Sequence, residues 1–389
     1  MKKTRWLISF VCVLLPCFAC GFNIKLSSAE EEYKLYNSYK EHPAWSPREE
    51  KILFVLTEFS TKGYEYKLCL IDTDGTNFTE LPGTTGVVDD NFCWSPNGNG
   101  IVFAKRGNSP SLEGDIYVIS KDGSIIRKLT NSECYYSQIS WSPDGKKIAF
   151  TKSLKQQKEI WLIDSKGVFQ KLTDGKHPSW SPDGKKIAFL FGHSINIINL
   201  EGKTHYSYSF NKPEEWWIVE DIKQNRKILW SLDASKLLFM PERDYNGIFS
   251  ISIQDNQNKG PALYINSKGN ILHRVSGLSL SPNGKEIAFS TIFGISKMDI
   301  TSPRPYNRNS READFAKSLL GHVKGLASYG PRLTTTLTRN SEDESPSWSP
   351  DARQIVFIRS GEIWLMDSDG SNQAQLTNKQ AIPEKIVKK

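Results

Sequence analysis

The stretch W-S-P-D-G-K-K-I-A-F occupies residues 141–150 and recurs unchanged at residues 180–189. Weaker copies keep its frame, in which a Trp, or once a Leu, is followed nine positions later by Phe. The separations between successive copies are 49, 47, 39, 50, 50 and 68 residues, mostly in the range expected for one four-stranded sheet per repeat. The seven pairs are Trp45/Phe54, Trp94/Phe103, Trp141/Phe150, Trp180/Phe189, Trp230/Phe239, Leu280/Phe289 and Trp348/Phe357. The chain is therefore predicted to be an array of structural repeats.

Each repeat is expected to fold into four short strands, A to D, as residues 138–173 illustrate. Pro143-Asp-Gly145 supplies the turn between strands A and B, because Pro presets φ near −65° and Gly takes the left-handed conformation of a bulged hairpin. Strand C is predicted at 159–164 and strand D at 169–173. The turn between C and D has a recurring signature, assigned to residues 71–75, 119–123, 165–167, 200–202, 265–269 and 366–370.

The residue that opens each pair is called the anchor. The position before it is small in six of seven repeats, which suits sheets that pack face to face at interior density. With many Gly, Pro and Trp residues and no sustained helical period, the fold class is all-β, a β-propeller of four-stranded blades. Seven blades are expected, with six plus a degenerate unit as the alternative. The propeller is placed at 42–377, with units starting near 42, 91, 138, 177, 227, 277 and 345, and a basic tail at 378–389.

The N-terminus has the pattern of an export signal. Lys2, Lys3 and Arg5 precede an apolar run at 6–15 that is too short to span a membrane as a mature helix. Ala19 before Cys20 resembles a bacterial lipobox, in which the Cys becomes lipidated; simple cleavage is the alternative. We expect a signal peptide at 1–19 and a tether at 20–41.

Charge and cysteine usage exclude several classes of protein. The lysines recur at turn positions around the array, whereas a nucleic-acid reader would concentrate them on one face, so no nucleic-acid partner is expected. Beyond the signal and Cys20, the cysteines are Cys69, Cys93 and Cys134, an odd number that cannot be fully paired within the chain. No C-x-x-C pair occurs, so zinc and thioredoxin-type chemistry lack support, and no cofactor is expected.

The W-S-P-D-G-K-K-I-A-F strings, with the I-W-L-I-D and K-L-T strands that follow, closely resemble the PD40, or TolB-like, β-propeller repeat, which is WD40-like. TolB itself carries an α/β domain ahead of its propeller, and about twenty residues between signal and first repeat leave no room for one. The export signal and the Ala19-Cys20 pattern, together with this resemblance, predict an exported, lipid-anchored, monomeric and non-enzymatic scaffold. It would bind a protein, peptide or glycan in the periplasm or at the outer membrane of a bacterium, or, as the alternative, would be secreted.

Binding is expected in the variable B–C and D–A connections, which share one face of the disc, because loops on a rigid scaffold are where recognition usually resides. Exposed aromatics flanked by charge are typical of interface anchors. In the segments 211–227 and 241–261, and after Cys134, the partner-binding candidates are Tyr135, Tyr136, Trp216, Trp217, Glu220, Asp221, Arg243 and Tyr245. The alternative for Trp216 and Trp217 is that they pack the insertion against its own blade.

Repeat six carries an insertion at 301–333 between strands C and D. Asn309 to Glu312 resembles a capping box, and apolar residues recur at helical spacing up to Leu326. We expect this segment to pack on the disc or cover a channel mouth, with partner recognition as the alternative.

Enzymatic activity has one candidate basis. The chain lacks a G-x-S-x-G elbow and a hydrolase-sized region, which excludes a propeller-linked serine hydrolase. However, His42, Gln138 and His177 each lie three residues before an anchor and would converge on a metal if that position faced the axial channel. Oligogalacturonate lyases have similar repeats and a channel metal, so a channel-based carbohydrate-active enzyme is the alternative to a non-enzymatic scaffold.

Overall fold

The computed structural model divides the chain into two units, Met1–Asn37 and Ser38–Lys389. It describes residues 38–60, 63–106, 114–131, 134–154, 157–164, 166–209, 228–240, 248–253, 262–264, 275–301, 327–328 and 334–378, all of which belong to the second unit. The candidates Cys20, Trp216, Trp217, Glu220, Asp221, Arg243 and Tyr245 lie outside these residues. So do the capping box and helical pattern of the expected insertion.

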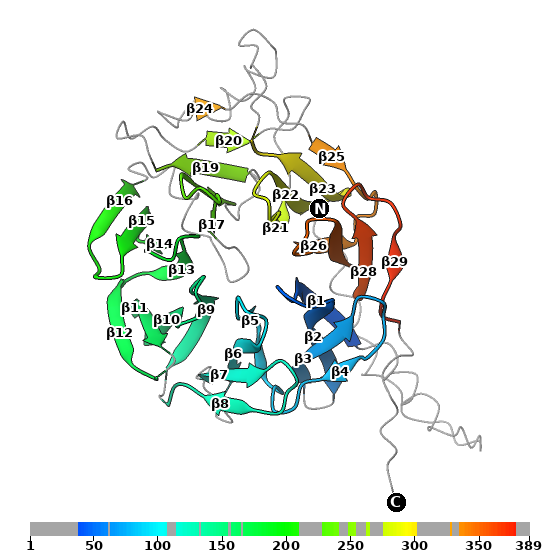
Figure 1. Ribbon diagram of the computed structural model, residues 1–389, viewed down its shortest axis with the longest axis horizontal. Helices are drawn as coiled ribbons and strands as arrows, with labels where there is room; N and C mark the ends of the chain where they lie inside the picture. Colours follow the sequence, from blue (N-terminus) through cyan, green and yellow to red (C-terminus); the bar gives the residue numbers. More distant parts are fainter. Residues whose placement is uncertain are drawn as a thin grey trace, which may run out of the picture. The chain divides into compact units, whose positions relative to one another are not determined.

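The second unit is a seven-bladed β-propeller, which confirms the predicted fold class and the preferred blade number (Figure 1). Blades 1 to 3 contain β1 (Ser38–Trp45), β2 (Lys51–Ser60), β3 (Gly63–Asp72), β4 (Thr79–Glu80), β5 (Val87–Trp94), β6 (Gly100–Arg106), β7 (Gly114–Ser120), β8 (Ile126–Lys128), β9 (Tyr135–Trp141), β10 (Lys147–Leu154), β11 (Gln157–Asp164) and β12 (Phe169–Asp174).

Blades 4 and 5 contain β13 (Lys176–Trp180), β14 (Lys186–Phe191), β15 (Ser194–Asn199), β16 (Thr204–Ser209), β17 (Leu229–Trp230), β18 (Lys236–Phe239), β19 (Ile248–Ser252), β20 (Ala262–Tyr264) and, as a fifth strand, β24 (Ala327–Ser328). Blades 6 and 7 contain β21 (Ser276–Leu280), β22 (Glu286–Thr291), β23 (Gly294–Asp299), β25 (Thr334–Thr336), β26 (Asp343–Trp348), β27 (Gln354–Arg359), β28 (Glu362–Asp367) and β29 (Ala374–Gln375).

In every blade four strands that follow one another along the chain pair antiparallel in chain order. Blade 5 adds β24, which comes from the segment between β23 and β25 of blade 6. Blade 7 is built only from β26–β29, and blade 1 only from β1–β4. The ring nevertheless closes, since β1 contacts β26, β27 and β28. Contacts between blades, not a shared sheet, therefore hold the first and last blades together.

Blade 5 differs from the expected assignment. Residues 265–269 were predicted to be its C–D turn, but strand C is β19 and strand D is β20, so this segment follows strand D. The B–C connection is consequently short, and the predicted insertion at 241–261 is interrupted by β19. The prediction was wrong because a Ser-Lys-Gly turn signature also suits a connection between blades.

The insertion of repeat six does lie between strands C and D, β23 and β25. Its described part is β24, which pairs parallel with β20, joining Ala262 to Ala327 and Leu263 to Ser328. A strand from the insertion of blade 6 thus extends the sheet of blade 5 at its outer edge (Figure 1).

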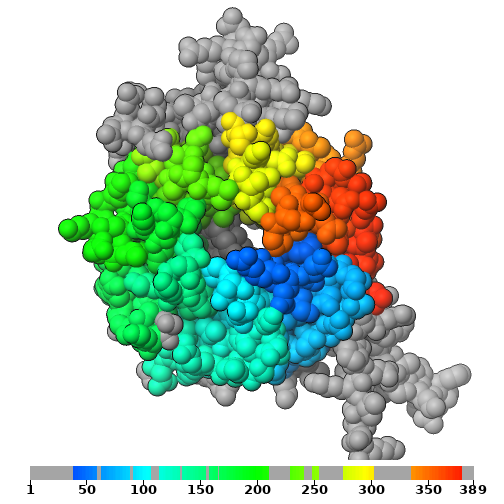
Figure 2. Space-filling view, in the orientation of Figure 1, coloured from blue at the N-terminus to red at the C-terminus, as the bar shows by residue number. Residues whose placement is uncertain are grey.

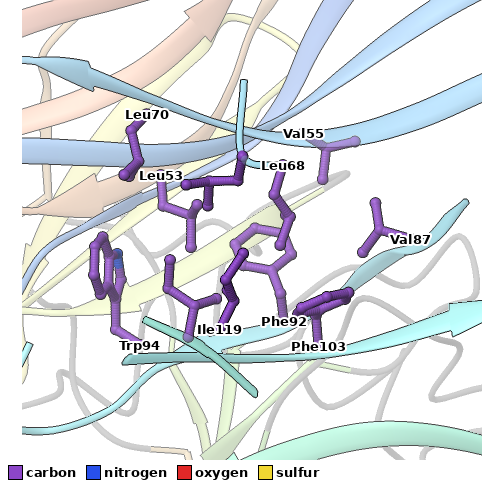
Figure 3. Close-up of a cluster of buried hydrophobic side chains, with 11 residues drawn as sticks. Leu53, Val55, Leu68, Leu70, Val87, Phe92, Trp94, Phe103 and Ile119 are labelled. Carbon is purple, nitrogen blue, oxygen red and sulfur yellow. The ribbon is translucent and has the colours of Figure 1, made fainter. Parts of the chain in front are cut away.

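The hydrophobic core lies between successive blades. In Figure 3, Leu53, Val55, Leu68 and Leu70 of blade 1 face Trp94, Phe103 and Ile119 of blade 2. The Phe of each repeat pair is buried, with an exposed fraction of 4% or less in all seven blades. The alternation of large and small residues along strand A therefore reflects blade-to-blade packing, as the sequence predicted.

The S-P-D-G turn is held by two bonds from one Ser. In blade 3 the hydroxyl of Ser142 donates to Asp144 Oδ1 (2.6 Å) and accepts from the backbone N–H of Lys147 (2.9 Å). The hydroxyl bond, followed by the N–H of Lys146, lowers the pKa of Asp144. The Ser-to-Asp or Ser-to-Asn bond is also present in blades 2, 4, 5, 6 and 7. These local bonds explain why the motif marks the turn in sequence.

Candidate functional site

The anchor tryptophans join neighbouring blades as well as filling the core. Each bonded indole N–H donates to the carbonyl of the residue before the anchor of the preceding blade. The pairs are Trp45 to Ser347 (3.1 Å), Trp94 to Ala44 (3.3 Å), Trp180 to Ser140 (3.2 Å) and Trp230 to Ser179 (3.1 Å). The buried Nε1 atoms of Trp141 and Trp348 have no hydrogen-bond acceptor within the described structure. Sequence reasoning identified the anchors as core residues but missed this second role.

The seam between blades 7 and 1 carries a buried ion pair that the sequence did not reveal. Lys40 Nζ lies 2.9 Å from both carboxylate oxygens of Glu362, and the two residues are 2% and 5% exposed. Thr377 donates to the same carboxylate (2.6 Å), and the backbone N–H of Lys40 donates to Gly361 (2.9 Å). Burial of a salt bridge is offset only when further hydrogen bonds satisfy its charged groups, and Thr377 supplies one such bond to the carboxylate here.

In every blade except blade 5, the position three residues before the anchor lies on the first strand of the blade. These first strands are the innermost ones, around the hollow at the centre of the ring (Figures 1 and 2). His42, Gln138, His177 and Ser345 adopt left-handed backbone conformations there, with φ between 53° and 58°. The register of strands A and B shifts at each of them. A shared local bulge, not ligand binding, accounts for this repeated conformation.

Two of the three metal candidates meet across blades 3 and 4. Gln138 Oε1 accepts from the backbone N–H of His177 (2.9 Å) and from Thr151 Oγ1 (2.7 Å), which fixes the amide orientation. Gln138 Nε2 therefore donates to His177 Nε2 at 3.0 Å, and the imidazole accepts at that nitrogen. The backbone of Gln138 in turn donates to Asn91 Oδ1 of blade 2 (2.6 Å). The side chains form a hydrogen-bonded belt from blade to blade.

This belt does not fit a metal ion. Gln138 uses its carbonyl for two protein donors, and His177 uses Nε2 for the Gln138 amide. No cluster of three His, Cys, Asp or Glu residues suited to a metal occurs within the described ranges. His42 shares the left-handed bulge conformation of Gln138 and His177. The structure thus brings together two of the predicted ligands and gives both a structural role.

Comparison with known proteins identifies the repeat. The family model described as PD40, the TolB beta propeller domain, matches residues 23–212. The chain carries a TolB-like β-propeller. No curated protein sequence matches it.

Solved structures similar to the TolB-like propeller share its fold. The β-propeller domain of the Trilobed protease from Pyrococcus furiosus aligns with a TM-score of 0.55 and 12% identity, covering 88% of this chain and 97% of that one. Acylaminoacyl peptidase from Pyrococcus horikoshii aligns with a TM-score of 0.57 and 12% identity over 92% of this chain and 55% of that one. Oligogalacturonate lyase in complex with manganese gives 0.54 and 13%, covering 85% of this chain and 89% of that one.

The two faces of the TolB-like propeller carry different connections between strands. The A–B and C–D turns lie together on one, the turn face, where the C–D turn residue Lys121 donates to Glu49 of the neighbouring A–B turn. The B–C hairpins and D–A crossings lie together on the other, the loop face, where Gly175 N donates to Lys158 O (2.8 Å). This arrangement confirms the predicted grouping of connections.

The structure describes Tyr135 and Tyr136 among the partner-binding candidates. Both lie in β9, not in a crossing, and Tyr136 is 4% exposed, with its ring edge-on to Phe150 at 5.5 Å between centroids. The expectation that Tyr136 is an exposed aromatic was wrong, because strand A begins earlier than the sequence suggested. Tyr135 is partly buried beside the same core.

The loop face of the TolB-like propeller carries apolar side chains that sequence reasoning missed. Leu154, Phe191 and Phe293 end or occupy B–C hairpins of blades 3, 4 and 6, and are 51%, 56% and 70% exposed. The sequence could have revealed these side chains, because apolar residues such as Ile292-Phe293 occupy two-residue hairpin turns, where residues are usually polar.

Burial raises the pKa of the Cys69 thiol, so this cysteine is not a reactive nucleophile. Cys69, Cys93 and Cys134 form no disulfide. No helix in the described part of the chain is long and apolar enough to cross a membrane.

Proposed function

We propose that this TolB-like propeller is a non-enzymatic scaffold of the bacterial cell envelope, exported and anchored through a lipid on Cys20, that binds a protein, peptide or glycan. The observation that carries the proposal is the use of Gln138 and His177. These side chains, the best placed for chemistry at the axis, are committed to bonds between blades 3 and 4. We infer that the side chains at the axis stabilise the ring and that the connections of the loop face bind the partner.

The connections at 210–227 and 241–247 join the strands that flank the loop face, since one follows β16 and the other lies between β18 and β19. The proposal assigns partner binding to Trp216, Trp217, Glu220, Asp221, Arg243 and Tyr245 within them. Paired aromatics with a polar rim are the usual anchors of such an interface.

The test is affinity capture from native cells after chemical crosslinking, read out by mass spectrometry. We expect a reproducible partner captured by the unsubstituted chain and lost with Trp216→Ala plus Trp217→Ala. Retention of every captured partner by this variant would contradict the assignment of the loop. The matched control is Ile125→Ala plus Val168→Ala on the turn face, where both side chains are exposed.

Attachment of the lipid is tested separately. Mass spectrometry of the processed N-terminus is expected to find a lipid-modified Cys20, and Cys20→Ser is expected to release the chain into the soluble fraction. An unmodified N-terminus within 1–19 or beyond Cys20 would contradict the proposed lipid anchor. It would not bear on the proposed binding role of the propeller.

The alternative is a channel-based carbohydrate-active enzyme resembling oligogalacturonate lyase. The observation in its favour is the fold shared with oligogalacturonate lyase in complex with manganese, whereas the bond between Gln138 and His177 argues against it. Elemental analysis of purified protein distinguishes the two, because stoichiometric manganese or another divalent metal, lost with His177→Ala, would favour the lyase.

A further inference from the structure

The outer edge of blade 4 differs from the outer edges of the other blades. The D strands β4, β8, β25 and β29 contain two or three residues each, and β20 of blade 5 is covered by β24. Among the described D strands only β12 and β16 contain six residues. Strand β12 includes Lys171 and Asp174, whereas β16 contains no Lys, Arg, Asp or Glu. Blade 4 therefore ends in a long outer strand without these charged residues.

The side chains of β16 are held by the rest of the propeller. On one face of the sheet, the hydroxyl of Ser207 donates to Asn196 Oδ1 of β15 (2.7 Å). On the other face, Tyr206 and Tyr208 pack against the core between blades 4 and 5. The pairing of β16 with β15 is regular from Tyr206 to Ser209. The strand is thus fixed in an extended conformation before any partner binds.

The backbone of β16 provides the unused binding groups. This strand ends the sheet of blade 4, at the rim of the ring, and no described strand pairs with its outer side (Figure 1). In such an edge strand, alternate residues direct their N–H and C=O groups away from the sheet. Proteins usually protect a long edge with Lys, Pro or a bulge, and the regular part of β16 has none of these. Another extended backbone is the partner that matches these groups.

Blade 5 shows that the outer edge of a blade in this propeller accepts an added strand. There β24 pairs with β20, joining Ala262 to Ala327 and Leu263 to Ser328. The edge of β20 contains three residues, half as many as that of β16. Blade 4 therefore offers a longer edge of a kind that is already used in the neighbouring blade.

A second copy of the chain fits the edge of β16 by symmetry. A two-fold axis that passes through Ser207 perpendicular to the sheet pairs two β16 strands antiparallel and keeps corresponding faces on the same side. Tyr206 of one copy then lies opposite Tyr208 of the other, and aromatic pairs of this kind stabilise neighbouring strands. No like charges meet, because the strand contains no Lys, Arg, Asp or Glu.

We propose that the propeller forms a symmetric dimer in which the two β16 strands pair and join blade 4 of each copy into one continuous sheet. This proposal departs from the monomer predicted from the sequence, since an open edge becomes visible only in the order of the strands. An interface of one short strand per copy is small, so the dimer is expected to be weak and to depend on concentration. It does not rest on the proposed binding function.

Sedimentation velocity between about 1 μM and 1 mM protein tests the dimer. Because Ser38–Lys389 is a compact unit by itself, the chain beginning at Gly21, without signal or lipid, is used. We expect the unsubstituted chain to shift from monomer to dimer. Ser207→Lys and Ser207→Asp each place like charges opposite one another at the two-fold axis, and each should weaken association by about fivefold or more. An equal mixture of the two variants should restore it, because opposite charges then face each other.

The matched control is Thr336→Lys, which places the same charge at an exposed position of the short outer strand β25. We expect this variant to dimerise like the unsubstituted chain. Circular dichroism melting curves confirm that every variant folds. A monomer at all concentrations, equal weakening in the control, or a mixture that associates no better than its two components would overturn the proposal. None of the substitutions lies on the loop face, so failure leaves the proposed partner binding unaffected.

Discussion

The indole Nε1 of Trp45, in the first blade, donates a 3.1 Å hydrogen bond to the backbone carbonyl of Ser347, in the last. The two residues are 302 positions apart, and among the described strands none is exchanged between their sheets. The same bond joins blades 1 and 2, 3 and 4, and 4 and 5. This repeated hydrogen bond from a Trp side chain thus helps to close the ring, a role that a shared sheet would otherwise fill.

The worth of this bond is measured by comparing Trp45→Phe with Trp141→Phe. Both substitutions remove the same atoms from half-buried anchors, but only Trp45 makes the indole bond. We expect Trp45→Phe to lower the free energy of unfolding by about 1 kcal/mol more than Trp141→Phe, as for a typical net hydrogen bond. Urea unfolding followed by fluorescence gives both values. Equal effects would show that the indole N–H contributes nothing to closure.

The Lys40–Glu362 pair is expected to be far more sensitive to removal of one partner than of both. Glu362→Ala leaves a buried ammonium without its carboxylate and should cost about 3–5 kcal/mol, whereas Lys40→Met plus Glu362→Met should recover most of that loss. The control is Glu159→Gln in the more exposed Lys171–Glu159 pair, expected to cost at most about 1 kcal/mol. A double variant as unstable as Glu362→Ala would contradict the account.

Blade 6 is joined by no indole bond at either seam, because its anchor is Leu280 and Trp348 Nε1 has no acceptor among the described residues. We expect local opening to begin there, and not between blades 7 and 1, where Trp45 and Lys40 act together. Native-state hydrogen exchange should find faster exchange in β21–β23 than in β1–β3. Faster hydrogen exchange in β1 than in β21–β23 would show that the seam between blades 7 and 1, which lacks a shared strand, opens first.

The turn aspartates make acid stability depend on the S-P-D-G motif. Bonds from the Ser hydroxyl lower the pKa values of Asp144, Asp183, Asp233 and Asp351. A carboxyl with a lowered folded-state pKa contributes stability that is present above its unfolded value of about 3.9 and lost as pH falls through the folded value. Unfolding free energy should therefore decline below about pH 4.

Changing these four aspartates to Asn should flatten that decline, because Asn97 and Asn283 already occupy the same turn position in blades 2 and 6. Melting temperatures between about pH 2 and 7 give the comparison. An unchanged slope in the variant would place the acid sensitivity elsewhere, for example at Asp122, whose pKa the hydroxyl of Ser120 and further bonds from Ser124 lower to about 2.

Local chemistry explains how much of the fold was predictable. A Ser after each anchor, followed in most blades by Pro and by Asp or Asn, specifies the turn, so the hairpin between strands A and B was located in every blade. In blade 5 the Gly269 signature was equally local but belonged to a different connection, and β19 was missed. Lys40 and Glu362 were unpredictable, since they are 322 residues apart and neither belongs to a repeated motif.

The candidate site was predicted less well, for a related reason. The pairing of Gln138 with His177 followed from repeat phase, but their bonding to each other and not to a metal depends on side-chain directions that phase does not give. Tyr136 was assigned to a surface because strand A was taken to start later than β9 does. The roles of Trp216 and Trp217 remain predictions.

The central claim is that the propeller acts through its loop face. A photo-crosslinking amino acid placed at Phe191 or, as the turn-face control, at Val168 in native cells tests it most directly, since both positions are more than half exposed. The account predicts adducts to an envelope partner from position 191 and none from position 168. Adducts from position 168 with none from position 191 would contradict it.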